Sequence, residues 1–283
     1  MSDGSSLINL GDISKPATVL IEKISDAIGG YCKPFQMRRI AKAESDVEII
    51  KFKSQLELED LQKRALNRFI NEESRKQENM EEITQKALPY LGDDAKPENI
   101  QDDWLINFFD KCRNISDTDM QSIWSKILSG EANAPGSFSK RCVNFIASLE
   151  TSEALQFTSL CSFEWNFGIK VPLVMNDEDS IYRENGLNFS ILTHLDTIGL
   201  IKFNSFSPIS SRGLGKSIKG SYFGRWVILD FEKETNNELN LGTVIFSQIG
   251  KELANISEAK IIPSFFDYCT AKWKEKNIRV RVL

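Results

Sequence analysis

Residues that could carry out catalysis or bind a metal are few in this sequence. The chain of 283 residues has one histidine, His194, and five cysteines: Cys32, Cys112, Cys142, Cys161 and Cys269. A Ser–His–Asp triad needs a serine and an aspartate around its histidine, and a zinc site needs ligands at close spacing, which these cysteines lack. The sequence therefore predicts no catalytic residues, no cofactor and no metal site.

Two further patterns resemble functional motifs but lack essential parts of them. Gly213–Ser217 ends like a phosphate-binding loop, but the required first glycine is absent and no helix pattern follows. Adjacent or near-adjacent carboxylates, the usual groups for acid–base chemistry, occur at Asp102 and Asp103 and at Asp177 and Asp179. Both pairs fall at expected helix starts or turns, so a carboxylate-based enzyme is the least favoured functional hypothesis.

The composition is that of an ordinary globular protein, with 41% hydrophobic and 27% charged residues and a net charge of −5. That charge argues against general binding of polyanions. Residues 1–10 have no basic segment followed by an apolar core, and no apolar run is long enough for a membrane span. We therefore expect a cytoplasmic protein with buried, reduced cysteines.

The first segment, residues 1–34, is expected to form one amphipathic helix over Asp12–Tyr31. Its apolar face predicts packing against a partner helix, and Gly29 and Gly30 predict its end. The alternative, peripheral contact with a membrane, is less favoured because the polar face is close to neutral rather than rich in Lys and Arg.

The second segment, residues 35–91, has no Gly or Pro from Phe35 to Leu88 and predicts one long helix. Apolar residues, several of them eleven positions apart, lie along one side of this helix. This period predicts a nearly straight coiled coil and a homo-oligomer. The alternative is two antiparallel helices that turn within the polar run Asn71–Asn79. The residues predicted for self-association are Val47, Ile50, Leu58, Leu61, Phe69, Met80 and Ile83.

The third segment, residues 92–168, has helix patterns with a dense aromatic core and predicts a helical bundle. Ser116, Ser139 and Thr151 are the expected helix caps, and Gly130 the expected end of the second helix. The fourth segment, residues 169–283, mixes helix and strand patterns and predicts an α+β domain. Its expected elements include a Ser/Gly-rich loop after Phe203, an apolar strand over Arg225–Phe231, and helices over Gln248–Ile256 and Ser264–Lys276. The expected fold class is therefore mainly α, with a long N-terminal helix, a central bundle and a C-terminal winged-helix-like domain.

The winged-helix prediction depends on a helix over Leu187–Ile198, followed by Gly199 and a strand over Leu200–Phe203. Between Asp196 and Asp230 the sequence has basic residues but no acidic ones, as in a phosphate-contacting wing. A solvated flexible loop, or a loop that docks on the acidic stretch Asp93–Asp119 of the same molecule, is the alternative. The residues predicted to bind nucleic acid or a protein partner are Asn188, Thr193, His194, Lys202, Arg212, Lys216, Lys219 and Arg225.

Four segments resemble an uncharacterised bacterial family known as domain of unknown function 2806. They are GDISKPATVLIEKISDAIGG (Gly11–Gly30), ITQKALPYL (Ile83–Leu91), the tryptophan-containing segment Asp102–Arg141, and ILTHLDTIGLI (Ile191–Ile201). More distantly, the order of these parts is similar to that of the abortive-infection alpha proteins of phage defence. The resemblance implies a bacterial setting and a defence role, and it supplies no catalytic residue.

Three functions are thus expected from the sequence, in decreasing order of preference. The first is a non-enzymatic interaction or sensor protein of phage defence that self-associates through its N-terminal helix. The second is a DNA-binding regulator that uses the winged-helix-like domain, although its helix Leu187–Ile198 has no Lys or Arg for base readout. The third is the carboxylate-based enzyme.

Overall fold

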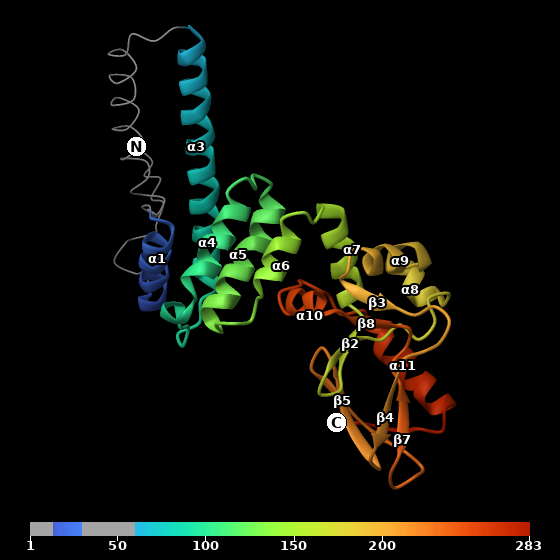
Figure 1. Cartoon of the computed structure of the whole chain (residues 1–283). Coiled ribbons are helices and arrows are strands. Elements are labelled where there is room, and N and C mark those ends of the chain that lie inside the picture. The colour runs from blue at the N-terminus through green and yellow to red at the C-terminus, as the bar shows by residue number, and fades with distance from the viewer. Residues whose placement is uncertain (1–13, 30–59) are drawn as a thin grey trace, which may run out of the picture. The chain divides into compact units, whose positions relative to one another are not determined.

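The computed structural model describes residues 14–29 and 60–283 of the chain. The chain divides into two compact units, Met1–Ser148 (unit 1) and Leu149–Leu283 (unit 2). The described elements of unit 1 are α1 (Lys15–Ile28), α3 (Asp60–Ala87), the short 3-10 helices η1 (Leu88–Tyr90) and η2 (Pro97–Asn99), α4 (Asp102–Cys112), α5 (Thr118–Asn133) and α6 (Lys140–Ile146) (Figure 1).

Helix α1 forms where the sequence predicts an amphipathic helix. Ser14 accepts a hydrogen bond from the Ala17 backbone N at 3.4 Å, and Gly29 ends the helix in the left-handed conformation, with φ of 64°. Leu20 and Ile24 are fully buried, and α1 packs against α4 and η2. The apolar face is therefore used for packing within unit 1, as the sequence predicts, while the membrane alternative is left untested.

Helix α3 is one continuous helix from Asp60 to Ala87. It passes through the polar run Asn71–Asn79 without a turn, so the alternative of two antiparallel helices meeting there is wrong. The earlier part of the predicted long helix, residues 35–59, lies outside the described residues. Among the helices that the structure describes, none is both long enough and apolar enough to cross a bilayer.

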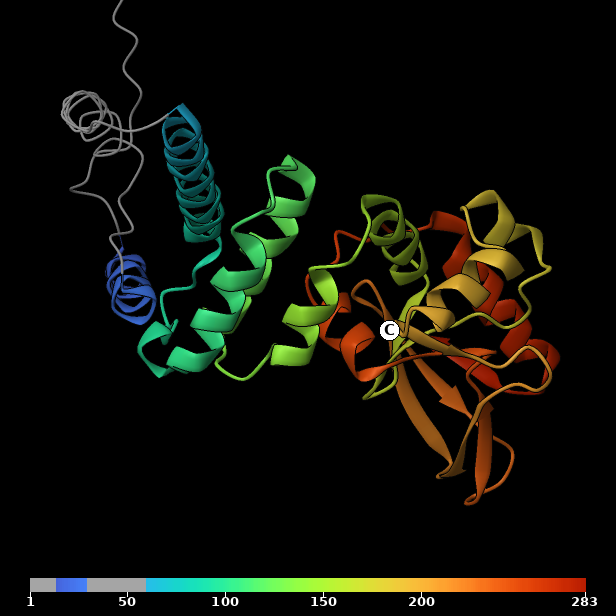
Figure 2. The same ribbon diagram turned by 45° about the horizontal axis from the view of Figure 1, so that its top comes forward.

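The core of unit 1 is aromatic, as the sequence predicts. The rings of Phe108 on α4 and Trp124 on α5 meet edge to face at 5.1 Å between centroids. The Trp104 indole donates to the Phe138 carbonyl at 2.6 Å and so fixes the loop before α6. Helix α4 also packs against α6, and α3 packs against α5 (Figure 2).

The expected helix caps need correction at three of four positions. Ser139 caps α6 as predicted, by accepting from the Cys142 N at 3.1 Å. Helix α5, however, is capped by Asp117 rather than Ser116, and the first helix of unit 2, α7 (Thr151–Cys161), by Glu150 rather than Thr151. Helix α5 also continues past Gly130, because this glycine does not end a helix but makes room for the ring of Phe138.

Unit 2 contains five helices and nine strands within the described residues. After α7 they are β1 (Glu164–Asn166), β2 (Lys170–Pro172), α8 (Ser180–Glu184), α9 (Phe189–Thr197), β3 (Ile201–Phe203), β4 (Ser210–Leu214), β5 (Ser217–Tyr222), β6 (Arg225–Asp230), β7 (Asn237–Asn240), β8 (Val244–Phe246), α10 (Gln248–Ala254), α11 (Pro263–Glu275) and β9 (Arg279–Val282). The four-segment division that the sequence suggests, at residues 34, 91 and 168, stays a prediction.

The strands of unit 2 are antiparallel and form three sheets. The largest has five strands in the order β2-β1-β5-β6-β9, while β3 pairs with β8 and β4 pairs with β7. Alternation along β6 buries Val227 and Leu229 on one face of the five-stranded sheet and leaves Trp226 on the other. One face of this sheet therefore belongs to the core, and the other is open.

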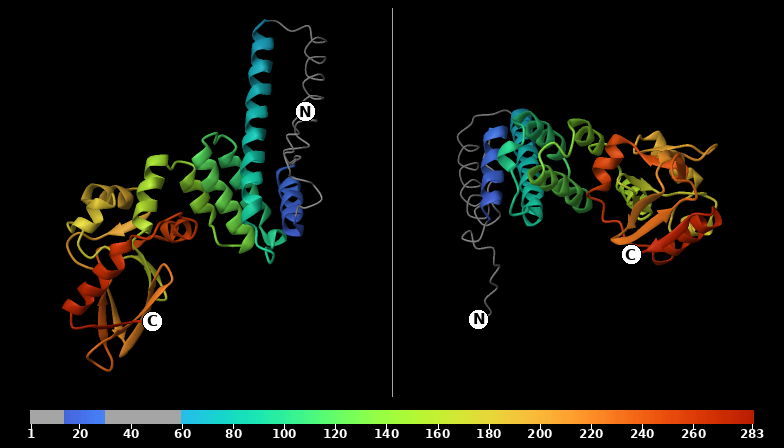
Figure 3. Two further views of the ribbon diagram at one scale, coloured as in Figure 1. Left: turned by 180° about the vertical axis from the view of Figure 1, so that it is seen from behind. Right: turned by 90° about the horizontal axis from the view of Figure 1, so that it is seen from below.

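Helix α11 supplies the other side of this core (Figure 3). The Trp165 ring of β1 stacks on Phe266 of α11 at 5.6 Å and meets Trp273 edge to face at 4.8 Å. Tyr222 of β5 stacks on the same Trp165 ring at 5.5 Å. This aromatic cluster joins β1, β5 and α11, which are far apart in the sequence.

The predicted fold class is wrong. Helices make up 53% and strands 16% of the described residues, so the protein is mixed α+β rather than mainly α. A winged-helix-like C-terminal domain is not present, because β3 does not turn back into a hairpin with the next strand. Its partner is β8, with Ile201 opposite Phe246 and Phe203 opposite Val244. The intervening segment builds β4 to β7, which belong to the other two sheets.

Candidate functional site

The predicted self-association stripe on α3 has an exposed half and a buried half. Near the start of the helix, Leu61 is 68% exposed and Phe69 is 61% exposed, with exposed Ala65 between them. Later on the same side, Met80 is half-buried and Ile83 is fully buried. We call Leu61, Ala65 and Phe69 the exposed stripe. The remaining predicted residues lie outside the described part of the chain: Val47, Ile50 and Leu58.

The buried half of the stripe is covered by α5 and fixed by polar contacts. The Asn79 amide donates to the Arg113 carbonyl at 2.9 Å and accepts from the Gln121 amide at 3.4 Å. The Lys86 ammonium donates to Gln121 Oε1 at 2.8 Å. Since these buried groups are hydrogen-bonded to one another, they hold α3 against α5 in a single register. Ile83 is therefore used for packing inside unit 1, whereas Leu61 and Phe69 of the exposed stripe are not covered by it.

Charged residues beside the exposed stripe are paired along the helix itself. Arg64 lies 3.2 Å from Asp60, and Arg68 lies 3.7 Å from Glu72, both at the i, i+4 spacing. Residues 60–73 contain three acidic and three basic side chains, so this half of α3 has no net charge. Such exposed pairs contribute little to stability, about 0.3–0.5 kcal/mol each, but they leave a neutral surface around the apolar stripe.

The predicted binding residues of α9 have structural roles or stand alone on the surface. Asn188 caps the helix by accepting from the Ile191 N at 3.0 Å, and Thr193 is exposed. His194 Nε2 lies 2.8 Å from Glu153 Oε1 of α7. A hydrogen bond from the Glu150 backbone N, helped by His194, lowers the pKa of Glu153. The histidine of this chain thus connects α9 to α7.

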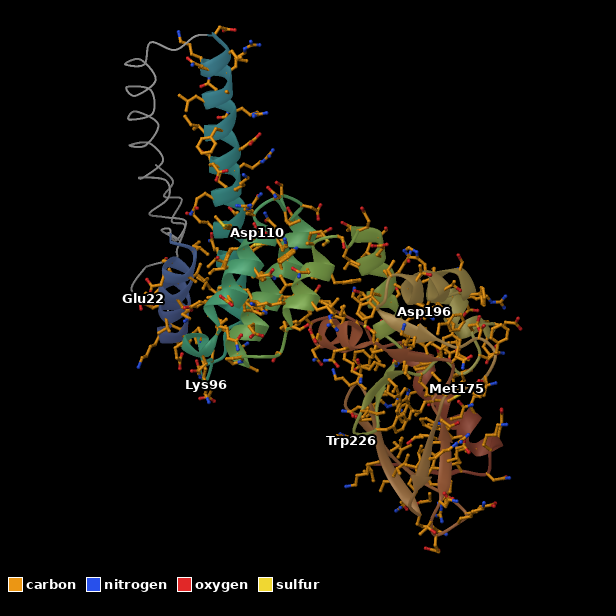
Figure 4. The ribbon with its side chains drawn as sticks, in the orientation of Figure 1. Glu22, Lys96, Asp110, Met175, Asp196 and Trp226 are labelled. Atoms are coloured by element: carbon orange, nitrogen blue, oxygen red, sulfur yellow. The ribbon has the colours of Figure 1, made fainter. Side chains whose placement is uncertain are left out.

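The predicted cations of the basic segment are mostly neutralised. Arg225 lies over the Phe266 ring, 3.7 Å from its centroid, in a cation–π contact. Lys219 is exposed on β5 and has no ion pair among the described residues. The other three have acidic partners, at 3.9 Å for Lys202 and Asp196, 3.4 Å for Arg212 and Glu238, and 3.0 Å for Lys216 and Glu234 (Figure 4 labels Asp196).

The structure distributes these cations over three sheets, and only Lys219 and Arg225 of the five lie on the two strands of one hairpin, β5–β6. Lys202 lies on β3, Arg212 on β4, and Lys219 and Arg225 on β5 and β6, which belong to three different sheets. Sequence reasoning missed their partners because Glu234 and Glu238 follow the basic segment and pair back to it. The sequence offers no local signal for the Arg212–Glu238 pair, because these residues come together only where β4 pairs with β7.

Three of the four carboxylates in the two predicted pairs also have structural partners: Asp102, Asp103 and Asp179. Asp102 lies 2.5 Å from Lys23 of α1, and Asp103 lies 3.5 Å from Lys140 of α6. Asp179 accepts a hydrogen bond from the Tyr268 hydroxyl at 2.6 Å, which lowers its pKa. In residues 14–29 and 60–283, no group of three or more His, Cys, Asp or Glu side chains is placed to hold a metal ion.

Four cysteines are described, and all are buried and outside any disulfide bond: Cys112, Cys142, Cys161 and Cys269. Burial raises the pKa of Cys161 to about 12 and that of Cys112 and Cys269 well above the ordinary value. Because the thiolate is the reactive form, these three thiols are unreactive at neutral pH. Cys32 lies outside the described residues.

Comparison with known proteins gives one match. The sequence profile of a family described as a protein of unknown function (DUF2806) matches residues 63–270. No curated protein and no solved structure matches the chain. The profile match confirms the first of the two resemblances expected from the sequence, while the similarity to abortive-infection proteins stays a prediction.

Proposed function

The chain belongs to the DUF2806 family, whose function is unknown, and we propose that it is a non-enzymatic interaction protein that associates with a second copy of itself through α3. The observation that carries this proposal is the exposed stripe of Leu61, Ala65 and Phe69. Large apolar side chains in a row on a polar helix are unusual unless another surface covers them.

A second copy is the occupant that fits this stripe best. The spacing of eleven residues from Val47 to Leu58 and on to Phe69 predicts a nearly straight coil between identical helices. The zero net charge of residues 60–73 removes repulsion between two such helices. Helix α5 is not the occupant, because it covers only the second half of α3 and leaves Phe69 61% exposed.

The energy available from the exposed stripe is modest. Covering Leu61 and Phe69 in two copies removes roughly 400 Å² of apolar surface, worth about 10 kcal/mol. Association itself costs about 4–15 kcal/mol, so the described stripe alone supports weak, concentration-dependent association. Further apolar residues of the predicted coil, outside the described residues, would strengthen it.

The cellular setting is the second part of the proposal. Four buried, reduced cysteines support a reducing compartment such as the bacterial cytoplasm. The role in phage defence is supported only by the resemblance to abortive-infection proteins. Plaque counts on cells with and without the gene test it, and equal counts over a broad panel of phages would refute it. The DNA-regulator hypothesis is not carried further, because most of its predicted cations are paired within the protein.

The test of self-association is sedimentation velocity of the full chain over a range of concentrations. We expect the wild type to form a dimer or higher oligomer as concentration rises, and a Leu61→Ser/Phe69→Ser double variant to stay monomeric. A Leu155→Ser variant is the matched control, since Leu155 on α7 is also an exposed leucine at 65%. A wild type that remains monomeric at high concentration, or a double variant that still associates like the control, would refute the proposal.

A further inference from the structure

A cavity of about 330 Å³ lies in unit 2, at the edge of the open face of the five-stranded sheet. It has no part in the proposed self-association. Residues from β1, β2, β5, the turn after β5 and the segment after α10 surround it. Those that the argument uses are Glu164, Asn166, Lys170, Ser221 and Phe223.

The charged groups of the cavity are a paired carboxylate and ammonium. Lys170 Nζ lies 3.1 Å from Glu164 Oε1, and the two side chains are 42% and 17% exposed. Within the described part of the chain, no donor reaches the second carboxylate oxygen of Glu164. Burial raises the pKa of Glu164, while Lys170 acts in the opposite direction. The cavity thus offers a hydrogen-bond donor next to a carboxylate that still has acceptor capacity.

Strand register extends this site into a row of polar side chains. Lys170 lies opposite Asn166, Asn166 opposite Ser221, and Ser221 opposite Trp226. Residues directly opposite each other in antiparallel strands project from the same face. Four neighbouring strands therefore place an ammonium, an amide, a hydroxyl and an indole in one row, and Trp226 at its end is 47% exposed (Figure 4).

An aromatic side chain in strained backbone stands beside the cavity. Phe223 occupies the turn between β5 and β6 with φ of 44°, followed by Gly224 with φ of 81°. The left-handed conformation favours Asn or Gly at this position of a hairpin and is rare for a bulky residue. Phe223 is nevertheless 45% exposed, and its ring is held edge-on by Tyr222 at 4.9 Å. Strain retained at an exposed aromatic residue points to a functional use of its ring.

From this combination we infer that the cavity binds a guanine base. The Watson–Crick edge of guanine presents the O6 acceptor beside two N–H donors, N1–H and the N2 amino group. Lys170 would donate to O6, the Glu164 carboxylate would accept from N1–H and N2–H, and Phe223 would cover the face of the base. The volume is that of a small-ligand site.

The other bases fit less well. Adenine presents an acceptor, N1, where guanine presents N1–H, and this lone pair would face the Glu164 carboxylate. Cytosine likewise has an acceptor at N3, and uracil offers a single N–H between two carbonyl groups. A carboxylate that must accept two parallel hydrogen bonds from a base edge therefore selects guanine.

A guanine base can reach this cavity in a free nucleotide or in a single strand. The row beyond the cavity separates the two sources, because a strand would continue over Trp226 and Lys219 while a mononucleotide would not reach them. Aromatic rings and lysines on an open sheet face are the usual groups for stacking bases and neutralising phosphates in single strands. Substitution of Trp226 is therefore expected to weaken binding of a strand only.

The test measures binding to the full chain in two arms. In the first arm, calorimetry compares GMP, AMP, CMP and UMP. In the second, fluorescence anisotropy compares a labelled oligothymidylate that contains one guanine with the same strand containing adenine. We expect a guanine preference of at least about tenfold in one arm or both. Binding in the second arm alone, lost in Trp226→Ala, assigns the site to a strand, and binding of GMP alone assigns it to a nucleotide.

Single-residue variants distinguish a change in base recognition from a loss of binding caused by misfolding. Glu164→Gln replaces one acceptor by a donor and should shift the preference from guanine toward adenine, to which a carboxamide pairs. A merely unfolded protein could not produce such a shift. Phe223→Ala should weaken every base, and Glu238→Gln, outside the cavity, should change nothing. Three outcomes would overturn the inference. The first is equal binding of the four mononucleotides without a guanine preference in the strand, and the second is no binding in either arm. The third is unchanged guanine binding by Glu164→Gln.

Discussion

Removing one hydroxyl group from Tyr222 should destabilise unit 2 more than any surface change of similar size. Tyr222 is fully buried, and its hydroxyl donates to the Ser162 carbonyl at 2.8 Å and accepts from the Ile262 backbone N at 2.8 Å. Burial raises the pKa of Tyr222 to about 12, so the proton needed for donation stays in place at neutral pH. One side chain thus satisfies two backbone groups that are 100 residues apart.

The magnitude follows from the groups left behind. Tyr222→Phe keeps the ring and its stacking on Trp165 but leaves one buried carbonyl and one buried N–H without a partner. Each such group costs about 1–3 kcal/mol, so the loss of both partners should lower the free energy of unfolding by about 2–6 kcal/mol. Tyr182→Phe should behave alike, since the Tyr182 hydroxyl donates to the Leu173 carbonyl at 2.9 Å and accepts from the Met175 N at 3.0 Å.

The assay is urea denaturation followed by tryptophan fluorescence, with Tyr90→Phe as the control. Tyr90 is 51% exposed, so loss of its hydroxyl should change the free energy of unfolding by less than about 0.5 kcal/mol. If Tyr222→Phe matches Tyr90→Phe within about 0.5 kcal/mol, water or neighbouring groups replace the hydroxyl, and the reasoning about unsatisfied groups is refuted.

Three other predictions concern pH, packing and backbone. The pKa of Asp230 is lowered to about 2, chiefly by its hydrogen bond to Arg281 on β9, so this pairing stabilises the fold above the ordinary pKa of 3.8 and the stabilisation is lost as pH falls through about 2. In urea denaturation at a series of pH values, Asp230→Asn should remove this part of the acid dependence of stability. An unchanged acid dependence would contradict the prediction. Ile83→Ala should lower the free energy of unfolding by about 2–5 kcal/mol because Ile83 is fully buried, whereas Leu61→Ala should lower it by less than about 0.5 kcal/mol. Equal denaturation midpoints for the two variants would contradict the division of the α3 stripe into a buried and an exposed half. Gly242→Ala should cost more than about 2 kcal/mol, since Gly242 has φ of 85° and its Cβ would collide with the Val174 carbonyl; a normal thermal melt would refute this.

The sequence predicted well the elements that have a clear period or a clear end. Helix α1 ends at Gly29, and the bounds of α10 (Gln248–Ala254) and α11 (Pro263–Glu275) lie within two residues of the expected ranges. Strand β6 was evident from its apolar run at Arg225–Asp230. In each case the local pattern and the tertiary environment favour the same structure, which is why local reasoning sufficed.

Strand β5 was missed because its sequence is that of a loop. It contains Ser217, Gly220 and Ser221, and the Ser/Gly-rich segment has few β-branched residues. Gly220 nevertheless fits a strand, because the Phe167 ring lies where its Cβ would be. This contact forms only when β1 and β5 are paired, so no local pattern could reveal it. The same pairing creates the cavity around Glu164 and Lys170, which the sequence therefore did not indicate either.

The last strand, β9, protects the sheet from an unwanted neighbour. It pairs along β6, with Val227 opposite Val282 and Asp230 opposite Arg279. Without it, the apolar strand β6 would present unpaired N–H and C=O groups, a template on which another chain could add a strand and aggregate. Strand β9 becomes the edge instead, and it alternates Arg279 and Arg281 with valines, Arg281 being paired with Asp230 of β6. The exposed rim of the sheet therefore carries charged side chains, which discourage such addition.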